Sequence, residues 1–545
     1  MVSENDGYEL DELGLLKNDC LATKELSKIH QTLDLVNTVY HQDITLEKLA
    51  TGSLDDEKVY EVLANGCTQN VFQFSSHGIT KFLTEMKPSN IGDLIAANAL
   101  YRPATMGNLD DYVNCKKGLV APVYLWGTYN SLKDTFGLVV FQEQIVMMAR
   151  EVGGFSLGEG VKLVKFVSKK KTDKIRAMKD KFMIGAKNNG CPQEDADKIW
   201  AQIEAAGTYC FNKSHATAYA VTAYAGAWLK VHYPTAFYTV ALQWADDNEL
   251  VALMGEMEAI SNAKVVPPDI NVSEDIFHTD YNTNEIFWSI SRIKQLGAKA
   301  VQWIIDERKK NGEFTSITNF IDRIFKYKRK KYEYWDDPDN EDEATRCPVN
   351  ARCVLNLILA GCFDKVEHAG SVIERYAIIE KAAEQLGFEI KEKDIPVDMR
   401  GKHYFWSQQQ VKVSGIGSVD YKRIYDNSAI KPQLKGRVSY ATLQSITPNE
   451  MDGKKVGVCA TVVEVEEKKF KSKKTGGEET FCKLLLQQNN DLCECIVWPE
   501  EYKSMRPQLI DSKNKLIIFS ATVKYSDYAG KNNLQFMKRS LLEVL

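Results

Sequence analysis

The residues best suited to chemistry in this chain are four consecutive polar ones, Asn212-Lys213-Ser214-His215. They stand between a turn that contains Gly207 and an apolar, aromatic stretch that is predicted to be a helix. Their amide, ammonium, hydroxyl and imidazole groups supply hydrogen-bond donors and positive charge. Because the first N–H groups of a helix lack intrahelical partners, a helix start also binds phosphate well. The cluster therefore predicts an anion site, without identifying the anion.

A second cationic stretch lies upstream and combines Lys165 with the triplet Lys169-Lys170-Lys171. Lysine binds phosphate as a point charge and not as a planar fork. The run predicts phosphate contact, although a solvated helix face has the same sequence pattern.

Length and composition limit the classes of protein that these clusters can serve. A chain of 545 residues is long enough for three or four domains. Hydrophobic content of 44% and charged content of 26% are typical of a soluble globular protein. The net charge of -5 excludes a uniformly basic nucleic-acid binder, but it allows the local basic faces that contact phosphate.

Cysteine usage and hydropathy point to an intracellular protein. The twelve cysteines include no Cys-x-x-Cys pair, which predicts reduced, mostly buried thiols rather than a zinc site. No apolar run is long enough to span a bilayer, and no signal peptide is recognised. We therefore expect a cytoplasmic location, in a bacterium or an infected host cell, and no membrane partner.

Helical patterns dominate from about residue 55 to 245, and these helices must position the polar cluster. A turn-rich junction at 266–271 ends that part of the chain. Further on, a basic block at 326–331 beside an acidic one at 336–343 predicts an exposed loop. From residue 446 onward, short strand-like runs separated by turns predict a five-stranded OB barrel, a fold that often binds single-stranded nucleic acid.

Several short stretches resemble motifs of the bacterial replicative C-family DNA polymerases, the DNA polymerase III alpha subunits. They are Leu13-Gly14-Leu15-Leu16-Lys17-Asn18-Asp19, Val71-Phe72-Gln73-Phe74-Ser75-Ser76-His77-Gly78, Tyr101-Arg102-Pro103-Ala104-Thr105, Phe141-Gln142-Glu143-Gln144, Gly154-Phe155-Ser156-Leu157-Gly158, Phe211-Asn212-Lys213-Ser214-His215 and Trp228-Leu229-Lys230-Val231-His232-Tyr233-Pro234. Each motif is short. The resemblance rests on their shared order and spacing, which extend over most of residues 8–365.

The resemblance implies roles for individual residues. Asp19 takes the position of the last of three palm aspartates, a Mg²⁺ ligand, and Lys17 matches the family's lysine two residues earlier, so these two are the catalytic candidates. The implied nucleotide-binding residues are Arg102, Gln142, Lys165, Lys169, Lys170, Lys171, Asn212, Lys213, Ser214 and His215. The polar cluster is thus expected on the fingers surface that receives a nucleoside triphosphate.

The chain also departs from the family's motifs. His77 replaces an arginine, Ala104-Thr105 replace Gly-Pro after Arg102, and Val164 takes the place of one of two adjacent arginines. Ser289-Ile290-Ser291 replaces Gly-Ile-Gly in the helix-hairpin-helix region, whose backbone N–H groups bind duplex phosphates in the family. These substitutions predict altered loop shapes and altered phosphate contacts.

The implied fold class is multidomain: mainly α fingers with part of an α/β palm, a helix-hairpin-helix region and a C-terminal OB-like β-barrel. The expected domains are the palm remainder at 1–50, the fingers at 51–250, the helix-hairpin-helix and clamp-contacting region at 251–365 with a charged insertion at 326–346, a connector at 366–445 and the barrel at 446–545.

One part of the family's active site is missing from the sequence. The family holds two Mg²⁺ ions with three aspartates, two of them from an Asp-x-Asp motif upstream of the segment where this chain begins. The stretch most similar to this motif is Glu9-Leu10-Asp11, and it is not flanked by an apolar strand. We therefore expect the C-terminal half of a DNA-directed DNA polymerase, inactive without an N-terminal partner chain. A split-gene product, for example of a phage, and an expression fragment both fit.

The expected partners are primer–template DNA, a dNTP, the N-terminal polymerase half and a sliding clamp. The one loose candidate for a clamp-binding peptide, Gln385-Leu386-Gly387-Phe388, fits better as a helix end capped by Gly387. The alternative function is a non-catalytic DNA-binding protein built from polymerase fingers, hairpin and OB modules.

Overall fold

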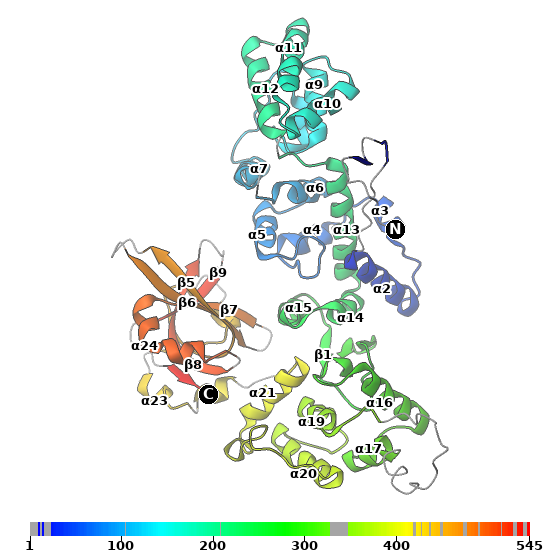
Figure 1. Cartoon of the computed structure of the whole chain (residues 1–545), viewed down its shortest axis with the longest axis vertical. Coiled ribbons are helices and arrows are strands. Elements are labelled where there is room, and N and C mark those ends of the chain that lie inside the picture. The colour runs from blue at the N-terminus through cyan, green and yellow to red at the C-terminus, as the bar shows by residue number, and fades with distance from the viewer. Residues whose placement is uncertain are drawn as a thin grey trace. The chain divides into compact units, whose positions relative to one another are not determined.

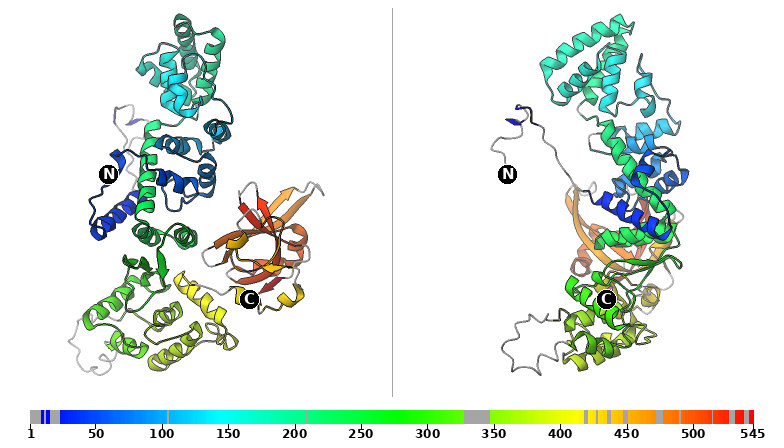
Figure 2. Two further views of the ribbon diagram at one scale, coloured as in Figure 1. Left: turned by 180° about the vertical axis from the view of Figure 1, so that it is seen from behind. Right: turned by 90° about the vertical axis from the view of Figure 1, so that its right-hand side faces the viewer.

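The chain folds into two compact units, Met1–Tyr233 and Pro234–Leu545 (Figure 1 and Figure 2). The structure, a computed structural model, describes residues 9–10, 13–15, 23–103, 105–207, 209–326, 347–417, 421–426, 428–434, 438–446, 451–471, 477–488, 491–513, 515–526, 531–537 and 542–545. Lys17 and Asp19 lie outside these residues, as does nearly all of the charged insertion predicted at 326–346. Among the described residues, no helix is long and apolar enough to cross a membrane.

One long helix, α13 (Lys213–His232), organises the first part of the first unit. It packs against α2 (Lys24–Val39), α3 (Leu46–Thr51), α4 (Glu57–Ala64) and α6 (Ile91–Leu100), and α5 (His77–Met86) and α7 (Leu109–Lys116) complete this part. Ala216, Ala220, Ala223 and Ala227 are fully buried along α13. Because the side chains at a helix contact set the distance between the axes, this alanine row lets the neighbouring helices approach closely.

The rest of the first unit is a helical lobe with its own hydrophobic core. Its helices are α8 (Tyr129–Leu132), α9 (Gln142–Glu151), α10 (Leu157–Ser168), α11 (Thr172–Asn188) and α12 (Gln193–Ala206). Phe155, Phe182 and Trp200 are buried in the core. A Cβ atom at Gly185 would lie 1.9 Å from the carbonyl oxygen of Gly153, so α11 packs in this place only because it carries glycine there.

Two segments that are distant in the sequence cross next to this lobe. Phe141 and Phe211 form a parallel β-bridge. The N–H of Phe211 donates to the carbonyl of Val140 (3.0 Å), and the N–H of Gln142 donates to the carbonyl of Phe211 (2.9 Å). Since α9 begins at Gln142 and α13 at Lys213, the bridge positions both helix starts.

The second unit begins with helices around a small sheet. α14 (Pro234–Trp244) and α15 (Asp247–Ile260) precede three strands in the order β1 (Lys264–Val266), β3 (Glu285–Phe287) and β2 (His278–Asp280). The following helices are α16 (Ala298–Asn311), α17 (Ile317–Ile324), α19 (Ala351–Ala360), α20 (Arg375–Leu386) and α21 (His403–Ser414). They share one core that includes Phe320, Phe363 and Trp406.

A closed barrel follows, reached through the short helices α22 (Tyr421–Asp426) and α23 (Lys431–Leu434). Its strands are β5 (Lys455–Lys471), β6 (Glu478–Gln488), β7 (Asp491–Val497), β8 (Leu516–Ser526) and β9 (Lys531–Phe536), with β4 (Ser439–Tyr440) and β10 (Leu542–Val544) added outside the ring. The ring runs β5-β6-β7-β9-β8 and closes because β8 also pairs with β5. Helix α24 (Pro499–Ile510) connects β7 to β8. The predicted fold class, mainly helical with an OB-like barrel at the end, is confirmed, while the finer domain boundaries stay a prediction.

Candidate nucleotide and nucleic-acid interface

The predicted polar cluster forms the start of α13. Asn212 is the N-cap residue, and its Oδ1 accepts hydrogen bonds from the N–H of His215 (2.9 Å) and from the hydroxyl of Ser214. The N–H of Lys213 donates to Glu143 Oε2 (2.9 Å). Two backbone donors of the helix start are therefore already bonded within the protein. An anion at this point would therefore meet the side chains of Lys213, Ser214 and His215 rather than these two backbone donors.

Arg102 and Gln142, far upstream in the sequence, reach the same place. The guanidinium carbon of Arg102 lies 3.8 Å from the centre of the Phe211 ring, and its Nη2 donates to the carbonyl of Ala99 (2.9 Å). Burial lowers the pKa of this guanidinium, which nevertheless stays protonated at neutral pH. Gln142 Nε2 donates to the carbonyl of Cys210 (3.3 Å). The structure thus brings Arg102, Gln142 and the polar cluster together around Phe211.

Aromatic rings continue along the same side of α13. The ring of His215 lies 5.2 Å from that of Phe211 and 4.1 Å from that of Tyr219, and Tyr219 lies 4.8 Å from Phe72. His215 is exposed, whereas the other three rings are half-buried. Sequence reasoning missed Tyr219 and Phe72 as site residues, although the spacing of 211, 215 and 219 at four-residue intervals is a helical signal.

Lys165, Lys169, Lys170 and Lys171 lie elsewhere, at the turn between α10 and α11. Lys165 belongs to the last turn of α10, Lys169 is its C-cap residue, and Lys171 is the N-cap residue of α11. Residues 162–187 hold ten basic side chains against two acidic ones, a net charge of +8. Only Lys181 of these ten forms an ion pair within the described chain, with Glu159.

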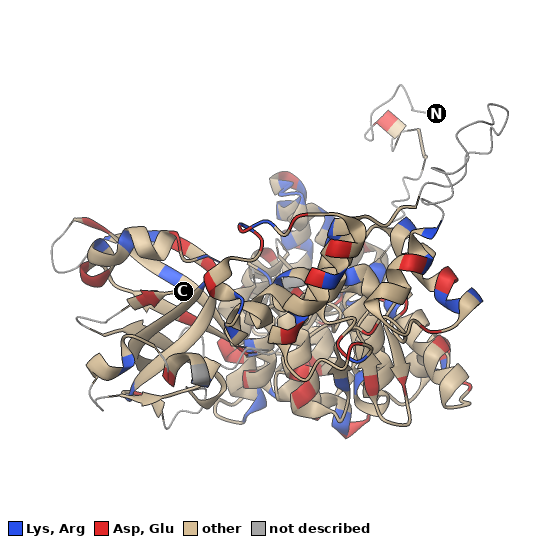
Figure 3. Cartoon of the chain, turned by 90° about the horizontal axis from the view of Figure 1, so that it is seen from below, with Lys and Arg blue, Asp and Glu red and all other residues tan. Residues whose placement is uncertain are grey.

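This concentration of charge is unusual for the chain. Acidic and basic residues are interspersed along most of the helices in Figure 3, and the net charge of the whole sequence is -5. Nine of the ten cations have no carboxylate partner in the described structure, and all of these except the half-buried Lys179 are exposed, so the α10–α11 hairpin is a polycationic surface. Such a surface attracts nucleic acid through its phosphates, irrespective of base sequence.

The Trp-Leu-Lys motif has a structural role. Lys230 is 1% exposed, and its ammonium donates to the carbonyls of Cys67 (3.0 Å) and Gln69 (2.6 Å). His232 Nε2 lies 2.6 Å from Asp56 Oδ2, and its ring lies 4.5 Å from that of Trp228. Burial acts to raise the pKa of Asp56, but the hydrogen bond and charge of His232 and the N–H groups of Lys58 and Val59 together outweigh burial, and the pKa is lowered. Lys230 and His232 thus tie α13 to the segments packed against it.

The helix-hairpin-helix region presents an exposed hairpin before α16. Gln295 has a φ of 65°, a left-handed conformation that favours glycine. Lys294 is anchored on both sides, since its N–H donates to the carbonyl of Val413 (2.8 Å) and its carbonyl accepts from Asn356 Nδ2 (2.6 Å). Gly297 is the N-cap residue of α16 and is exposed without a side-chain cap. Its carbonyl accepts from the N–H groups of Ala300 (2.8 Å) and Val301 (3.1 Å), which starts the helix.

Ser289, which stands at the first glycine position of the family's Gly-Ile-Gly, uses its hydroxyl internally. The hydroxyl donates to the carbonyl of Asp275 (2.8 Å) and accepts from the N–H of Ser291 (3.1 Å). The substitution therefore stabilises the turn locally and adds no donor to the surface.

An aromatic cluster lies on the outer face of the barrel. Phe470 on β5, Phe481 on β6 and Trp498 after β7 have ring centres 5.6–6.1 Å apart, and Trp498 is 38% exposed. Lys468 and Lys483 flank it and pair with Glu466 (3.1 Å) and Glu494 (2.8 Å). Because these charges are paired, this face is almost neutral. It can stack on the bases of a nucleic acid but attracts phosphates only weakly.

The segment predicted as a clamp peptide forms the end of α20. Gly387 is the C-cap residue in the left-handed conformation, with a φ of 66°. Gln385 Nε2 donates to Asp322 Oδ1 (2.9 Å) and to the carbonyl of Thr318 (3.2 Å). The glutamine is thus bonded to α17 within the protein, as expected of a capped helix end.

Within the described residues, no three His, Cys, Asp or Glu side chains are grouped so that they could hold a metal ion. Asp19, the one carboxylate that the resemblance assigns to Mg²⁺, is outside those residues. The described part of the chain thus supplies cations and rings but no metal centre.

Comparison with known proteins assigns these features to one family. The model of the bacterial DNA polymerase III alpha subunit finger domain matches residues 25–190, and a helix-hairpin-helix motif matches residues 262–335. The DNA polymerase III alpha subunit of Aquifex aeolicus is 31% identical over 531 residues, which cover 95% of this chain and 42% of the relative. The chain belongs to the DNA polymerase III alpha family. It corresponds to the C-terminal portion of these subunits.

Other DNA polymerase III alpha subunits give the same picture. That of Deinococcus radiodurans is 29% identical over 557 residues, covering 95% of this chain and 39% of the relative. That of Borreliella burgdorferi is 37% identical over 318 residues, covering 58% of this chain and 27% of the relative. The chain thus spans about two fifths or less of the length of these relatives.

Proposed function

We propose that this chain is the C-terminal half of a replicative DNA-directed DNA polymerase, working in the cytoplasm of a bacterium or an infected host cell. It binds an incoming dNTP and primer–template DNA together with an N-terminal partner chain that carries the other catalytic aspartates. The observation that carries the proposal is the net charge of +8 on residues 162–187, in a chain that is otherwise acidic. Membership of the polymerase family supports nucleic acid as the anion that this surface binds.

The start of α13 is the proposed cradle for the nucleotide. Arg102 lies over the ring of Phe211, and the ammonium of Lys213 lies 5.6 Å from the ring centre of Phe141 and 3.8 Å from Asp134 Oδ2. We propose that these two cations hold the triphosphate. The rings of His215 and Tyr219 lie next to them and offer flat faces to the nucleoside. Gln142 fixes the backbone crossing on which these side chains depend.

The metal chemistry depends on the partner chain. When bound, two Mg²⁺ ions would activate the primer 3′ hydroxyl and stabilise the leaving pyrophosphate. A single carboxylate, Asp19, cannot hold both ions, so the other ligands must come from the N-terminal polymerase half. A sliding clamp is a further proposed partner, through a segment other than the capped end of α20.

A non-catalytic DNA-binding protein is the second candidate function. It is favoured by the aromatic cluster of Phe470, Phe481 and Trp498, which can stack on unpaired bases without any metal or partner chain. In that case the fingers would serve only as a phosphate-binding surface.

Primer extension tests the proposal. The chain is co-expressed with an N-terminal polymerase half that carries Asp-x-Asp, and nucleotide incorporation is measured in Mg²⁺. We expect extension by the pair, no extension by either chain alone, abolition by Asp19→Ala and a raised KM for dNTP with Arg102→Ala. Lys198→Ala, which removes a lysine paired with Glu194 on α12, is the matched control. A pair that binds primer–template without extending it refutes the polymerase and supports the binding protein.

A further inference from the structure

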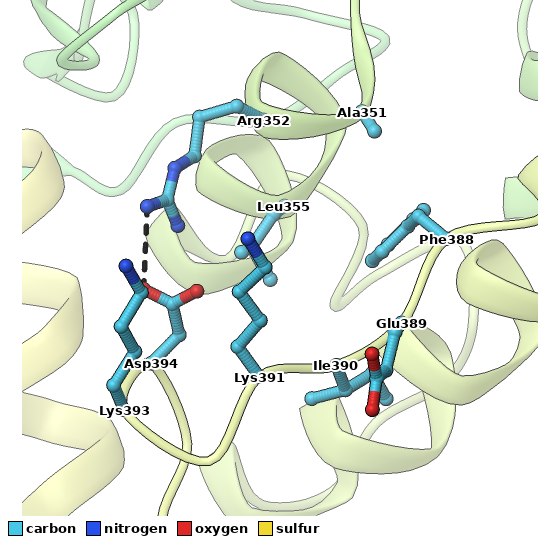
Figure 4. A pocket seen from close by; sticks show the side chains of 9 residues that line it. All are labelled: Ala351, Arg352, Leu355, Phe388, Glu389, Ile390, Lys391, Lys393 and Asp394. Atoms are coloured by element: carbon cyan, nitrogen blue, oxygen red, sulfur yellow. Dashed lines mark hydrogen bonds and ion pairs between the residues drawn. The ribbon is translucent and has the colours of Figure 1, made fainter.

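A small cavity opens beside the N-terminal end of α19 in the second unit. Its volume is about 270 Å³, and its floor is formed by Leu355 of α19 with Phe388 and Ile390 from the loop after α20 (Figure 4). Pockets for small molecules and cofactors have volumes of about 300–1,000 Å³. The cavity is therefore suited to one large side chain rather than to a whole nucleotide.

The loop that forms the rim is held in shape. Gly387 reverses the chain at the end of α20, and the N–H of Phe388 donates to the carbonyl of Ala383 (3.1 Å). The N–H groups of Asp394 (2.9 Å) and Ile395 (3.1 Å) both donate to the carbonyl of Lys391, and Ile395 is fully buried. The cavity is thus formed before any ligand arrives, which lowers the entropic cost of binding.

The rim has an excess of positive charge on one side. Arg352 pairs with Asp394 (3.2 Å), which neutralises that carboxylate. Lys391 and Lys393 are exposed and have no carboxylate partner in the described part of the chain, and both extend toward the end of α19 that carries Arg352 (Figure 4). Glu389 points away from them on the opposite side of the loop. A ligand thus meets an apolar hole beside two free ammonium groups.

We propose that this cavity is the docking site for an acidic peptide of a partner protein. The peptide inserts one large apolar side chain against Leu355 and Ile390 and places carboxylates on Lys391 and Lys393. An acidic peptide fits better than nucleic acid, because a peptide supplies an apolar side chain for the hole lined by Leu355 and Ile390, whereas a phosphate backbone does not. The site lies outside the nucleotide cradle and does not depend on polymerase activity.

Binding of a synthetic peptide to the full 545-residue chain tests the proposal. The probe is a short fluorescein-labelled peptide of aspartate and glycine with one central phenylalanine, followed by fluorescence anisotropy. Since an exposed ion pair contributes at most about fivefold to an affinity, the double variant Lys391→Ala/Lys393→Ala should weaken binding by about 5- to 25-fold. Ile390→Ser should also weaken it, and Lys310→Ala, on the exposed face of α16, should not.

Matched peptides separate the two parts of the site. Replacing the phenylalanine by alanine, or the aspartates by asparagine, should each abolish most of the binding. The proposal is overturned if the unmodified peptide does not bind, if the alanine peptide binds equally well, or if the lysine variant binds as the unmodified chain does. The proposal would also be overturned if a short single-stranded oligonucleotide displaced the peptide from the unmodified chain but not from the lysine variant. That result would assign the rim to nucleic acid. Thermal unfolding of each variant verifies that it is folded.

Discussion

Replacing Lys169, Lys170 and Lys171 together by glutamine should make DNA binding less dependent on salt. Each phosphate neutralised by a protein cation contributes about 0.9 to the slope of log K against log salt for duplex DNA, so three lysines account for about 2.7. Between 50 and 200 mM salt, this difference in slope makes the wild-type affinity fall about 40-fold more than that of the variant. The nine unpaired cations of residues 162–187 set the upper limit for the hairpin as a whole.

Fluorescence anisotropy with a labelled duplex, titrated at several KCl concentrations, measures the slope. The matched control replaces Lys48, Lys198 and Lys515 by glutamine, since each of these exposed lysines is paired with a carboxylate at 2.6 Å. The control should leave the slope unchanged. An equal fall in slope for both triple variants would show that only total charge matters, and no fall for the hairpin variant would show that it does not contact phosphate.

Three further predictions concern single residues. Lys230→Met leaves the carbonyls of Cys67 and Gln69 without their buried donor, so the free energy of unfolding in urea should fall by about 3 kcal/mol. The pKa of Asp56 is lowered in the folded chain, so its negative charge stabilises the fold at neutral pH. This stabilisation is lost as the pH falls through the lowered pKa. The difference in thermal stability between wild type and Asp56→Asn should therefore shrink between pH 5 and pH 3. Trp498→Ala should weaken binding of a single-stranded oligonucleotide by about 1–3 kcal/mol, with Tyr525→Ala, another exposed ring on the barrel, as the control.

Local sequence signals predicted those features that depend on neighbours in the chain. Asn212 precedes an apolar run, so the start of α13 could be located, and turn-separated strands predicted the barrel. Features that depend on tertiary packing were missed. The contact of Phe72 with Tyr219 joins two distant segments, and Lys230 is buried only because the carbonyls of another loop surround its ammonium.

The positions of Arg102 and Gln142 illustrate the same limit. Their inclusion as nucleotide-binding candidates came from motif resemblance, and the sequence contained no sign that both would meet at Phe211. Similarly, the helix-start pattern at 212–215 did not reveal that Glu143 would occupy the N–H of Lys213. Propensity and spacing describe one segment at a time, whereas a binding site is defined by several.

The β-bridge between Phe141 and Phe211 links the two hydrophobic cores of the first unit. It joins the segments that lead into α9 and α13 by two backbone hydrogen bonds, and Phe141 is buried in the same core as the alanine row of α13. Leu132 and Met148, on either side of Phe141 in the sequence, belong to the core of the lysine-rich lobe. A substitution that shifts the bridge would therefore disturb both cores, so the polycationic surface and the nucleotide cradle are constrained to change together in evolution.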